Sequence, residues 1–172
     1  MNMKTKHVVV VPYDEKWEQD FKEIAFELQD AIGELVLEVE HVGSTSVKGL
    51  SAKPIIDIDV VIQDDSVFGE VVSALAKIGY QHEGNLGIEG REAFRYDGKE
   101  HLRKHHLYVC SKNSVELHRH LVFRDYLREH PEAVKKYSKI KEDAAKCFPD
   151  SIDQYMAYKS SYIETVYRLI GL

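Results

Sequence analysis

The chain has 172 residues, 44% hydrophobic and 30% charged, a composition typical of a single globular domain with one core. Its formal net charge of −6 argues against unspecific nucleic-acid binding, which depends on a basic surface. No apolar run has membrane-spanning length, and the four valines before Pro12 are too few for a signal-peptide core. With two distant cysteines that suit a reducing compartment, we expect a cytoplasmic protein without a membrane partner.

The N-terminal part predicts a short strand at residues 8–11 and an amphipathic helix after it. Asp14 is placed to cap that helix, because its side chain can accept a backbone hydrogen bond from the first turn. The apolar side chains of the helix form one stripe: Trp17, Phe21, Ile24, Leu28, Ala31 and Ile32.

Residues 37–42 alternate like a half-buried strand, and Gly43 then allows a tight turn into a short helix that Ser44 or Thr45 would cap. Free N–H groups at such a helix start favour a phosphate, and the Ser44 hydroxyl adds a donor. A Gly-Ser pair is also common in ordinary turns. It is evidence for a phosphate site here only because acidic residues follow it at a short spacing in the chain.

The next segment, Ile55 to Ile62, is rich in β-branched residues and predicts a strand with Asp57 and Asp59 on the same face. Apolar residues on both faces predict a strand in the interior of the sheet. A buried carboxylate there is energetically costly unless a cation or a hydrogen-bond donor compensates its charge. Two carboxylates roughly 6 to 7 Å apart suit one hard cation, Mg²⁺ or Mn²⁺, with room for water and phosphate oxygens. The alternatives are that both acids face water and that Lys53 is an exposed lysine instead of a phosphate ligand.

Residues 64–79 predict a helix, followed by short strands up to Cys110. Arg91 and Arg95 share one strand face, which suits a polyanion or else an exposed hairpin closed by Asp97-Gly98. The last strand, Lys104 to Cys110, places His105 and His106 on opposite faces, so only one of them can look into a site.

From residue 113 the pattern is helical, with breaks at Pro131 and at Pro149-Asp150. The basic run from Lys135 to Lys141 fits a solvated helix face as well as a phosphate track. The stripe Tyr155, Tyr158 and Tyr162 fits packing, with a base-stacking platform as the alternative. His118 and His120 are two apart on a helix and do not face each other, which argues against structural zinc.

The pattern H-V-G-S-T-S-V-x-G-L-x-A-K-P-I-I-D-I-D at residues 41–59 resembles the GrpB family. This family is a branch of the nucleotidyltransferase superfamily, related to aminoglycoside nucleotidyltransferases and polymerase-β-like enzymes. Residues 11–14 with Trp17 and Phe21 resemble the family's opening, and residues 123–128 with His130-Pro131 resemble its signature helix.

The resemblance implies an α+β fold: a nucleotidyltransferase-like mixed sheet with helices in residues 1–111, and a helical region in residues 112–172 of the same domain. In active relatives a third carboxylate on a neighbouring strand completes the metal site. Here that strand holds no acid, so the resemblance implies that His105 or His106 replaces it. The G-R-x-x-F-R pattern at residues 90–95 directs Arg91 and Arg95 towards the site.

The expected function is Mg²⁺-dependent binding of a nucleoside triphosphate and transfer of a nucleotidyl group to a small acceptor. In this scheme Asp57 and Asp59 hold the metal, Gly43, Ser44 and Thr45 receive the triphosphate, and Lys53, Arg91 and Arg95 balance charge. One alternative is a non-catalytic nucleotide-binding module that acts through a protein partner, since members of the family occur fused to dephospho-CoA kinase. Another is a metal-dependent hydrolase with His105 or His106 as its base.

Overall fold

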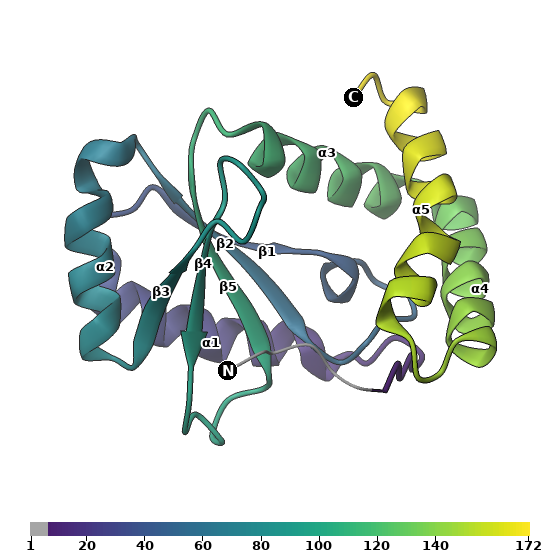
Figure 1. Cartoon of the computed structure of the whole chain (residues 1–172), viewed down its shortest axis with the longest axis horizontal. Coiled ribbons are helices and arrows are strands. Elements are labelled where there is room, and N and C mark those ends of the chain that lie inside the picture. The colour runs from purple at the N-terminus through teal and green to yellow at the C-terminus, as the bar shows by residue number, and fades with distance from the viewer. Residues whose placement is uncertain (1–6) are drawn as a thin grey trace.

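A computed structural model describes residues 7–172, which form a five-stranded mixed sheet flanked by helices (Figure 1). The strand order is β1-β2-β5-β4-β3, with β2 and β5 parallel and all other neighbours antiparallel. The strand bounds are Glu38–Val42 for β1, Ile56–Ile62 for β2, Tyr80–Gly84 for β3, Glu92–Tyr96 for β4 and His105–Ser111 for β5. The α+β architecture expected from the sequence is confirmed.

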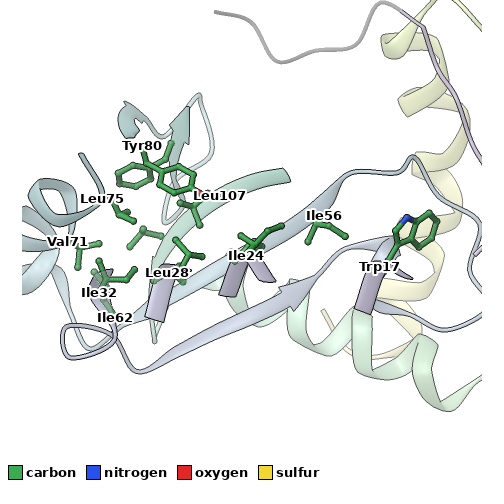
Figure 2. Close-up of a cluster of buried hydrophobic side chains, with 14 of the residues drawn as sticks. Trp17, Ile24, Leu28, Ile32, Ile56, Ile62, Val71, Leu75, Tyr80 and Leu107 are labelled. Atoms are coloured by element: carbon green, nitrogen blue, oxygen red, sulfur yellow. The ribbon is translucent and has the colours of Figure 1, made fainter. Parts of the chain in front are cut away.

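One face of the sheet carries the main hydrophobic core. Helix α1 (Lys16–Ile32) and helix α2 (Phe68–Lys77) cover this face with their apolar stripes. Figure 2 shows Ile56 of β2 between Ile24 and Trp17 of α1. It shows Ile62 of β2 near Ile32 of α1 and Val71 of α2. Burying each such side chain contributes about 1.5 to 3 kcal/mol, so this face holds the sheet in place and leaves the other face for polar groups.

Helix α3 (Val115–Glu129) lies on the opposite face. Its Leu117 packs with Val61 of β2 and Cys110 of β5 in a small apolar cluster, and Ser114 caps the helix by accepting a hydrogen bond from the Leu117 N–H at 3.3 Å. Because side chains alternate along β2, this is also the face that carries both strand carboxylates.

Helices α4 (Pro131–Cys147) and α5 (Ile152–Leu169) pack side by side at one end of the sheet (Figure 1). Leu50, which precedes β2, packs with Val134 and Tyr137 of α4 and with Leu127 of α3. Pro131 stands in the first turn of α4, where its missing N–H costs nothing, and the next break, residues 148–151, contains Pro149. Both predicted helix breaks are confirmed.

The N-terminal segment departs from the predicted strand at residues 8–11, because only Val11 pairs, in an isolated bridge with Ala52. Asp14 behaves as predicted, since its Oδ1 accepts from the Lys16 N–H at 2.9 Å. The helix predicted at residues 64–79 begins as a short 3₁₀ turn at Asp65–Val67 and ends at Lys77. Within residues 7–172, no helix has both the length and the apolar character needed to cross a membrane.

Candidate functional site

A pocket of about 280 Å³ opens on the carboxylate face of the sheet, where β2 and β5 meet α4 and α5. We call it the Asp57 pocket. Its size is close to the lower end of the range for small-molecule sites. Its polar and charged lining residues come from the sheet, the loops beside it and helices α3, α4 and α5: Ser44, Thr45, Lys53, Asp57, Arg91, His106, Tyr108, His120, Lys141, Tyr155 and Lys159.

The turn after β1 forms one wall of the pocket. Gly43 has a φ of 73°, a left-handed conformation that favours glycine, and a Cβ at this position would overlap Asp57 Oδ2. The next three residues form a single 3₁₀ turn, η1 (Ser44–Ser46), and Gly43 itself stands at its cap position. The glycine therefore lets the backbone approach a carboxylate closely.

Neither Ser44 nor Thr45 caps this turn, which corrects the prediction. The Thr45 hydroxyl is buried and hydrogen-bonds His41 Nε2 at 2.9 Å, so it is committed within the fold. Ser44 instead presents its hydroxyl to the side chain of Lys141 inside the pocket. Of the two hydroxyls, that of Ser44 is the better placed to meet a ligand.

Asp57 is the carboxylate that reaches the pocket, and about a third of its side chain is exposed (34%). His106 of β5 donates from Nδ1 to Asp57 Oδ1 at 3.0 Å. Burial raises the pKa of Asp57, but the hydrogen bond and the charges of His106, His120 and Lys53 outweigh burial and lower it overall. Asp57 is therefore an ionised carboxylate at neutral pH.

Asp59 lies deeper, with no exposed surface. His120 of α3 donates from Nδ1 to Asp59 Oδ2 at 2.5 Å, whereas Asp59 Oδ1 has no hydrogen-bond partner among residues 7–172. Burial lowers the pKa of His120, but the hydrogen bond and the charge of Asp59 raise it more, with a smaller contribution from Glu116. The imidazole is thereby stabilised in its charged form beside the carboxylate.

The two histidines of β5, His105 and His106, lie on opposite faces of the sheet, as the alternation of side chains along a strand predicts. His106 reaches Asp57, but His105 points into the opposite face of the sheet, where its Nε2 lies 2.7 Å from the Tyr80 hydroxyl. His105 Nδ1 donates to the Arg103 carbonyl at 2.7 Å, and its ring stacks on Tyr96 with centroids 4.4 Å apart. Burial lowers the pKa of His105 to about 4, so it is a neutral core residue and not a site residue.

The two arginines that were predicted to bind a polyanion from one strand face, Arg91 and Arg95, lie in different places. Arg91 lines the Asp57 pocket, and its guanidinium carbon lies 4.0 Å from the centre of the Tyr108 ring. Arg95 turns the other way and donates to Gln81 Oε1 at 2.9 Å on the exposed edge formed by β3 and β4. Arg95 is therefore outside the pocket, because its long side chain finds a partner on the neighbouring strand.

Two lysines that were not among the predicted site residues enter the pocket from the C-terminal helices, one of them Lys141 at the end of the basic run that also fitted a phosphate track. Lys141 of α4 is 2% exposed and contacts the Ser44 hydroxyl. Burial lowers the pKa of Lys141 well below its usual value, and the charges of Lys159 and Lys53 lower it further. Burial, with the charge of Lys53, lowers the pKa of Lys159 on α5 to about 8.

Helices α3 and α4 hold the pocket wall in position. Arg128 donates from Nε and Nη2 to the Ser46 carbonyl at 3.0 and 2.8 Å. Arg124 donates to the His41 carbonyl at 3.0 Å, and the Ser51 hydroxyl donates to Glu142 of α4 at 2.7 Å. The turn that carries Gly43 and Ser44 is therefore fixed by helices far from it in sequence.

The site face of β5 carries His106, Tyr108 and Cys110 opposite Asp57, Asp59 and Val61, so this strand supplies no third acid. Among residues 7–172, no group of three or more histidine, cysteine, aspartate or glutamate side chains is arranged to hold a metal ion. What the geometry offers a cation is two neighbouring carboxylates, one with an oxygen that lacks a partner among the described residues.

The model of the family described as "GrpB protein" matches residues 7–169. The chain belongs to the GrpB family. It is 35% identical over 160 residues to UPF0157 protein YqkA of Bacillus subtilis, covering 93% of this chain but 46% of that protein. It is 32% identical to Glutamate-rich protein GrpB of Alkalihalophilus pseudofirmus, covering 92% and 93% of the two chains.

The fold of this GrpB family member agrees with solved structures. A crystal structure of conserved protein GrpB from Enterococcus faecalis matches with a TM-score of 0.83 and 37% identity over 94% of this chain and 96% of that one. The GLD-2/RNP-8 complex matches with a TM-score of 0.61 and 16% identity, covering 91% and 61%. Cid1 in complex with its short product ApU matches with a TM-score of 0.56 and 14% identity, covering 78% and 42%, so these distant likenesses show a nucleotidyltransferase-like fold alone.

A segment similar to this chain also forms part of a larger protein. The chain is 25% identical to the Dephospho-CoA kinase of Mycolicibacterium paratuberculosis over 97% of its own length and 48% of the kinase. It thus spans about half the length of that kinase, as it does of YqkA.

Proposed function

We propose that the protein binds a nucleoside triphosphate together with Mg²⁺ or Mn²⁺ in the Asp57 pocket and transfers a nucleotidyl group to a small acceptor. The observation that carries the proposal is the close approach of the Gly43 turn to Asp57, which brings a phosphate-binding turn next to the exposed member of the acidic pair. The α+β fold and its distant likeness to the poly(U) polymerase Cid1 support this direction.

The acidic pair fits a hard divalent cation. Asp59 Oδ1 is a buried carboxylate oxygen without a donor among residues 7–172, a state that is costly unless a cation compensates it. Mg²⁺ is commonly held by one or two carboxylates, with waters and substrate phosphates as its other ligands, so two carboxylates suffice. When bound, the cation would neutralise charge that develops on the phosphate oxygens.

The residues of the chain then have separate roles. Ser44 and the backbone of the Gly43 turn bind phosphate oxygens, while Arg91 places a guanidinium at the opposite wall of the pocket. His106 orients Asp57 through its Nδ1 hydrogen bond, and His120 does the same for Asp59. His106 also stands on the strand where active relatives carry their third acid, and it is our candidate base for the acceptor.

A thermal-shift screen of nucleoside triphosphates with and without Mg²⁺ tests the proposal. Ligand at about a hundred times its Kd stabilises the fold by about 2.7 kcal/mol. For a domain of this size the melting temperature then rises by about 5 to 10 °C. The shift should require the metal and vanish in Asp57→Asn, with Asp65→Asn at an exposed site as the matched control. A flat response to all common nucleotides would overturn the proposal.

Turnover separates catalysis from binding. A nucleotidyltransferase releases pyrophosphate from the triphosphate once the right acceptor is supplied. The absence of an acid on the site face of β5 and the occurrence of a similar segment in dephospho-CoA kinases favour the competing function, a nucleotide-binding module that acts through a protein partner. Nucleotide binding without pyrophosphate release across a broad acceptor panel would assign that role. Release of phosphate or nucleoside monophosphate in water alone would assign a hydrolase.

A further inference from the structure

Three lysines enter the Asp57 pocket from separate parts of the chain. Lys53 precedes β2, Lys141 lies on α4 and Lys159 lies on α5. The lysines that do form ion pairs with carboxylates within residues 7–172 are others, on the surface or in a different part of the fold: Lys22, Lys99 and Lys139. The pocket therefore gathers amino groups that have no acidic partner in the described chain.

The contacts of the three lysines are with neutral groups. Lys141 Nζ hydrogen-bonds the Ser44 hydroxyl and lies 4.9 Å from the centre of the Tyr137 ring. The Nζ atoms of Lys159 and Lys53 lie 5.0 and 5.7 Å from the centre of the Tyr155 ring. Aromatic faces attract a cation but bring no negative charge, so three ammonium groups here repel one another.

The remaining groups of the pocket do not compensate the positive charge of the three lysines. Asp57 is the one carboxylate in the pocket lining among residues 7–172. The other titratable or charged groups near the lysines are Arg91 before β4, Lys104 before β5, His106 and Tyr108 on β5, His120 on α3, Tyr137 on α4 and Tyr155 on α5. Arg91 adds a further positive charge, so the pocket of the free protein disfavours protonation of the three lysines compared with an amine in water.

We propose that Lys53, Lys141 and Lys159 form a subsite for the terminal phosphoryl groups of a polyphosphate ligand, and that the ligand binds there together with protons taken from solvent. The inference rests on the proposed function for the class of ligand. It adds where the terminal phosphoryl groups bind and that protons are taken up when they bind. A polyanion supplies the negative charge that the pocket lacks, so it favours the charged form of each amine. Atoms balance because each neutral amine gains one proton and no covalent bond changes.

The coupling between ligand binding and proton uptake sets how the affinity for the polyphosphate changes with pH. Below the pKa of about 8 of Lys159 in the free protein, this lysine already carries its proton and binding needs no uptake by it. Above that value the ligand must draw the proton from solvent, so the affinity falls as pH rises. Lys141, whose pKa is lowered well below its usual value by burial and by Lys159 and Lys53, extends the same effect to lower pH.

Titration calorimetry with inorganic tripolyphosphate in the presence of Mg²⁺ tests the subsite directly. The wild type is titrated at pH about 8.5 in two buffers of different ionisation enthalpy, which gives the number of protons taken up. In Lys159→Arg the guanidinium keeps its proton at this pH, so the bound state carries the same charge as in the wild type, and we expect an affinity no weaker than that of the wild type with smaller proton uptake. The ligand's own protonation is common to both proteins and cancels in the difference.

Lys141→Met distinguishes a ligand-binding lysine from a structural one. Removing an unpaired buried amine should raise the melting temperature, whereas the affinity for tripolyphosphate should fall by about tenfold or more. Lys139→Met is the matched control on α4, because Lys139 is 78% exposed and pairs with Asp143 outside the pocket. It should leave the affinity and the proton uptake unchanged.

The outcomes separate this inference from the proposed function. Equal proton uptake in the wild type and Lys159→Arg, unchanged affinity in Lys141→Met, or no binding of tripolyphosphate would each overturn the subsite. A parallel titration with a nucleoside triphosphate and Mg²⁺ reports on the proposed function. If tripolyphosphate binds with proton uptake but no nucleotide binds, the phosphate subsite is supported and the nucleotide-binding proposal is overturned. If a nucleotide binds without lysine-dependent proton uptake, the nucleotide-binding proposal is supported and the subsite is overturned.

Discussion

His120 Nδ1 lies 2.5 Å from Asp59 Oδ2, so a helix outside the sheet supplies the hydrogen-bond donor for the more buried of the two strand carboxylates. Asp59 has no exposed surface, and no other donor among residues 7–172 reaches it. Because a buried carboxylate is costly without a partner, this pair couples the packing of α3 to the electrostatics of the candidate site.

We expect His120→Ala to lower the free energy of unfolding by about 3 to 5 kcal/mol, the usual cost of leaving a buried charge without its partner. Urea denaturation at neutral pH measures the change. His118→Ala is the matched control, because His118 is exposed on the same helix and its loss should change stability by no more than about 0.5 kcal/mol. Equal stability of the two variants would mean that Asp59 does not need the imidazole.

The strand that carries the acids was predictable because its signal is local. β-branched residues and the alternation of side chains place Asp57 and Asp59 on one face without knowledge of any other segment. His120 and Lys141 gave no such signal, since a residue on a helix joins a site only when the helix crosses the right face of the sheet. Helical spacing alone correctly separated His120 from His118 but said nothing of Asp59.

Stability should depend on pH through His105. Burial lowers the pKa of His105 from 6.5 to about 4 in the folded protein, so on acidification the unfolded chain takes up the proton first. The stability that the neutral imidazole contributes is complete above pH 6.5, is lost as pH falls from 6.5 to about 4, and changes no further below that. The full effect is about 3 kcal/mol.

His105→Gln isolates this contribution, because glutamine can hydrogen-bond the Tyr80 hydroxyl but does not titrate. Unfolding free energies of both proteins, measured by urea denaturation across this pH range, should differ by an amount that shrinks on acidification. A constant difference between the two proteins would show that His105 keeps an ordinary pKa. Other acid-sensitive groups are common to both and do not affect the comparison.

Gly43→Ala should destabilise the fold and damage the site at once. The left-handed φ of 73° strains any other residue, and the added Cβ would push against Asp57 Oδ2. We expect a loss of about 1 to 3 kcal/mol, together with weaker divalent-metal binding measured by calorimetry. Gly69→Ala in α2 is the control, because a Cβ there meets no atom within 4 Å and should leave stability unchanged or raise it by up to about 1 kcal/mol.

Arg95 was predicted to lie in the site because strand alternation gives incomplete information about long side chains. Strand alternation assigns a side chain to a face, but it does not say how far along that face a long side chain reaches. Arg95 shares the parity of Arg91 and yet reaches Gln81 on β3, because β3 pairs with β4 at this position and offers an amide oxygen. Short side chains such as Asp57 were placed correctly because they stay close to their own backbone.

Arg128→Lys tests whether α3 preorganises the phosphate-binding turn. The guanidinium donates two hydrogen bonds to the Ser46 carbonyl, and an ammonium group cannot reproduce this fork. We expect the fold to lose about 1 kcal/mol by urea denaturation and the affinity for nucleoside triphosphate to fall severalfold, because the turn must then be ordered by the ligand. Arg119→Lys on the same helix keeps the charge at a partly exposed pair with Glu116 and should leave the affinity unchanged. If Arg128→Lys lowers stability but not affinity, the turn is held in its binding conformation by Gly43 and Lys141 alone.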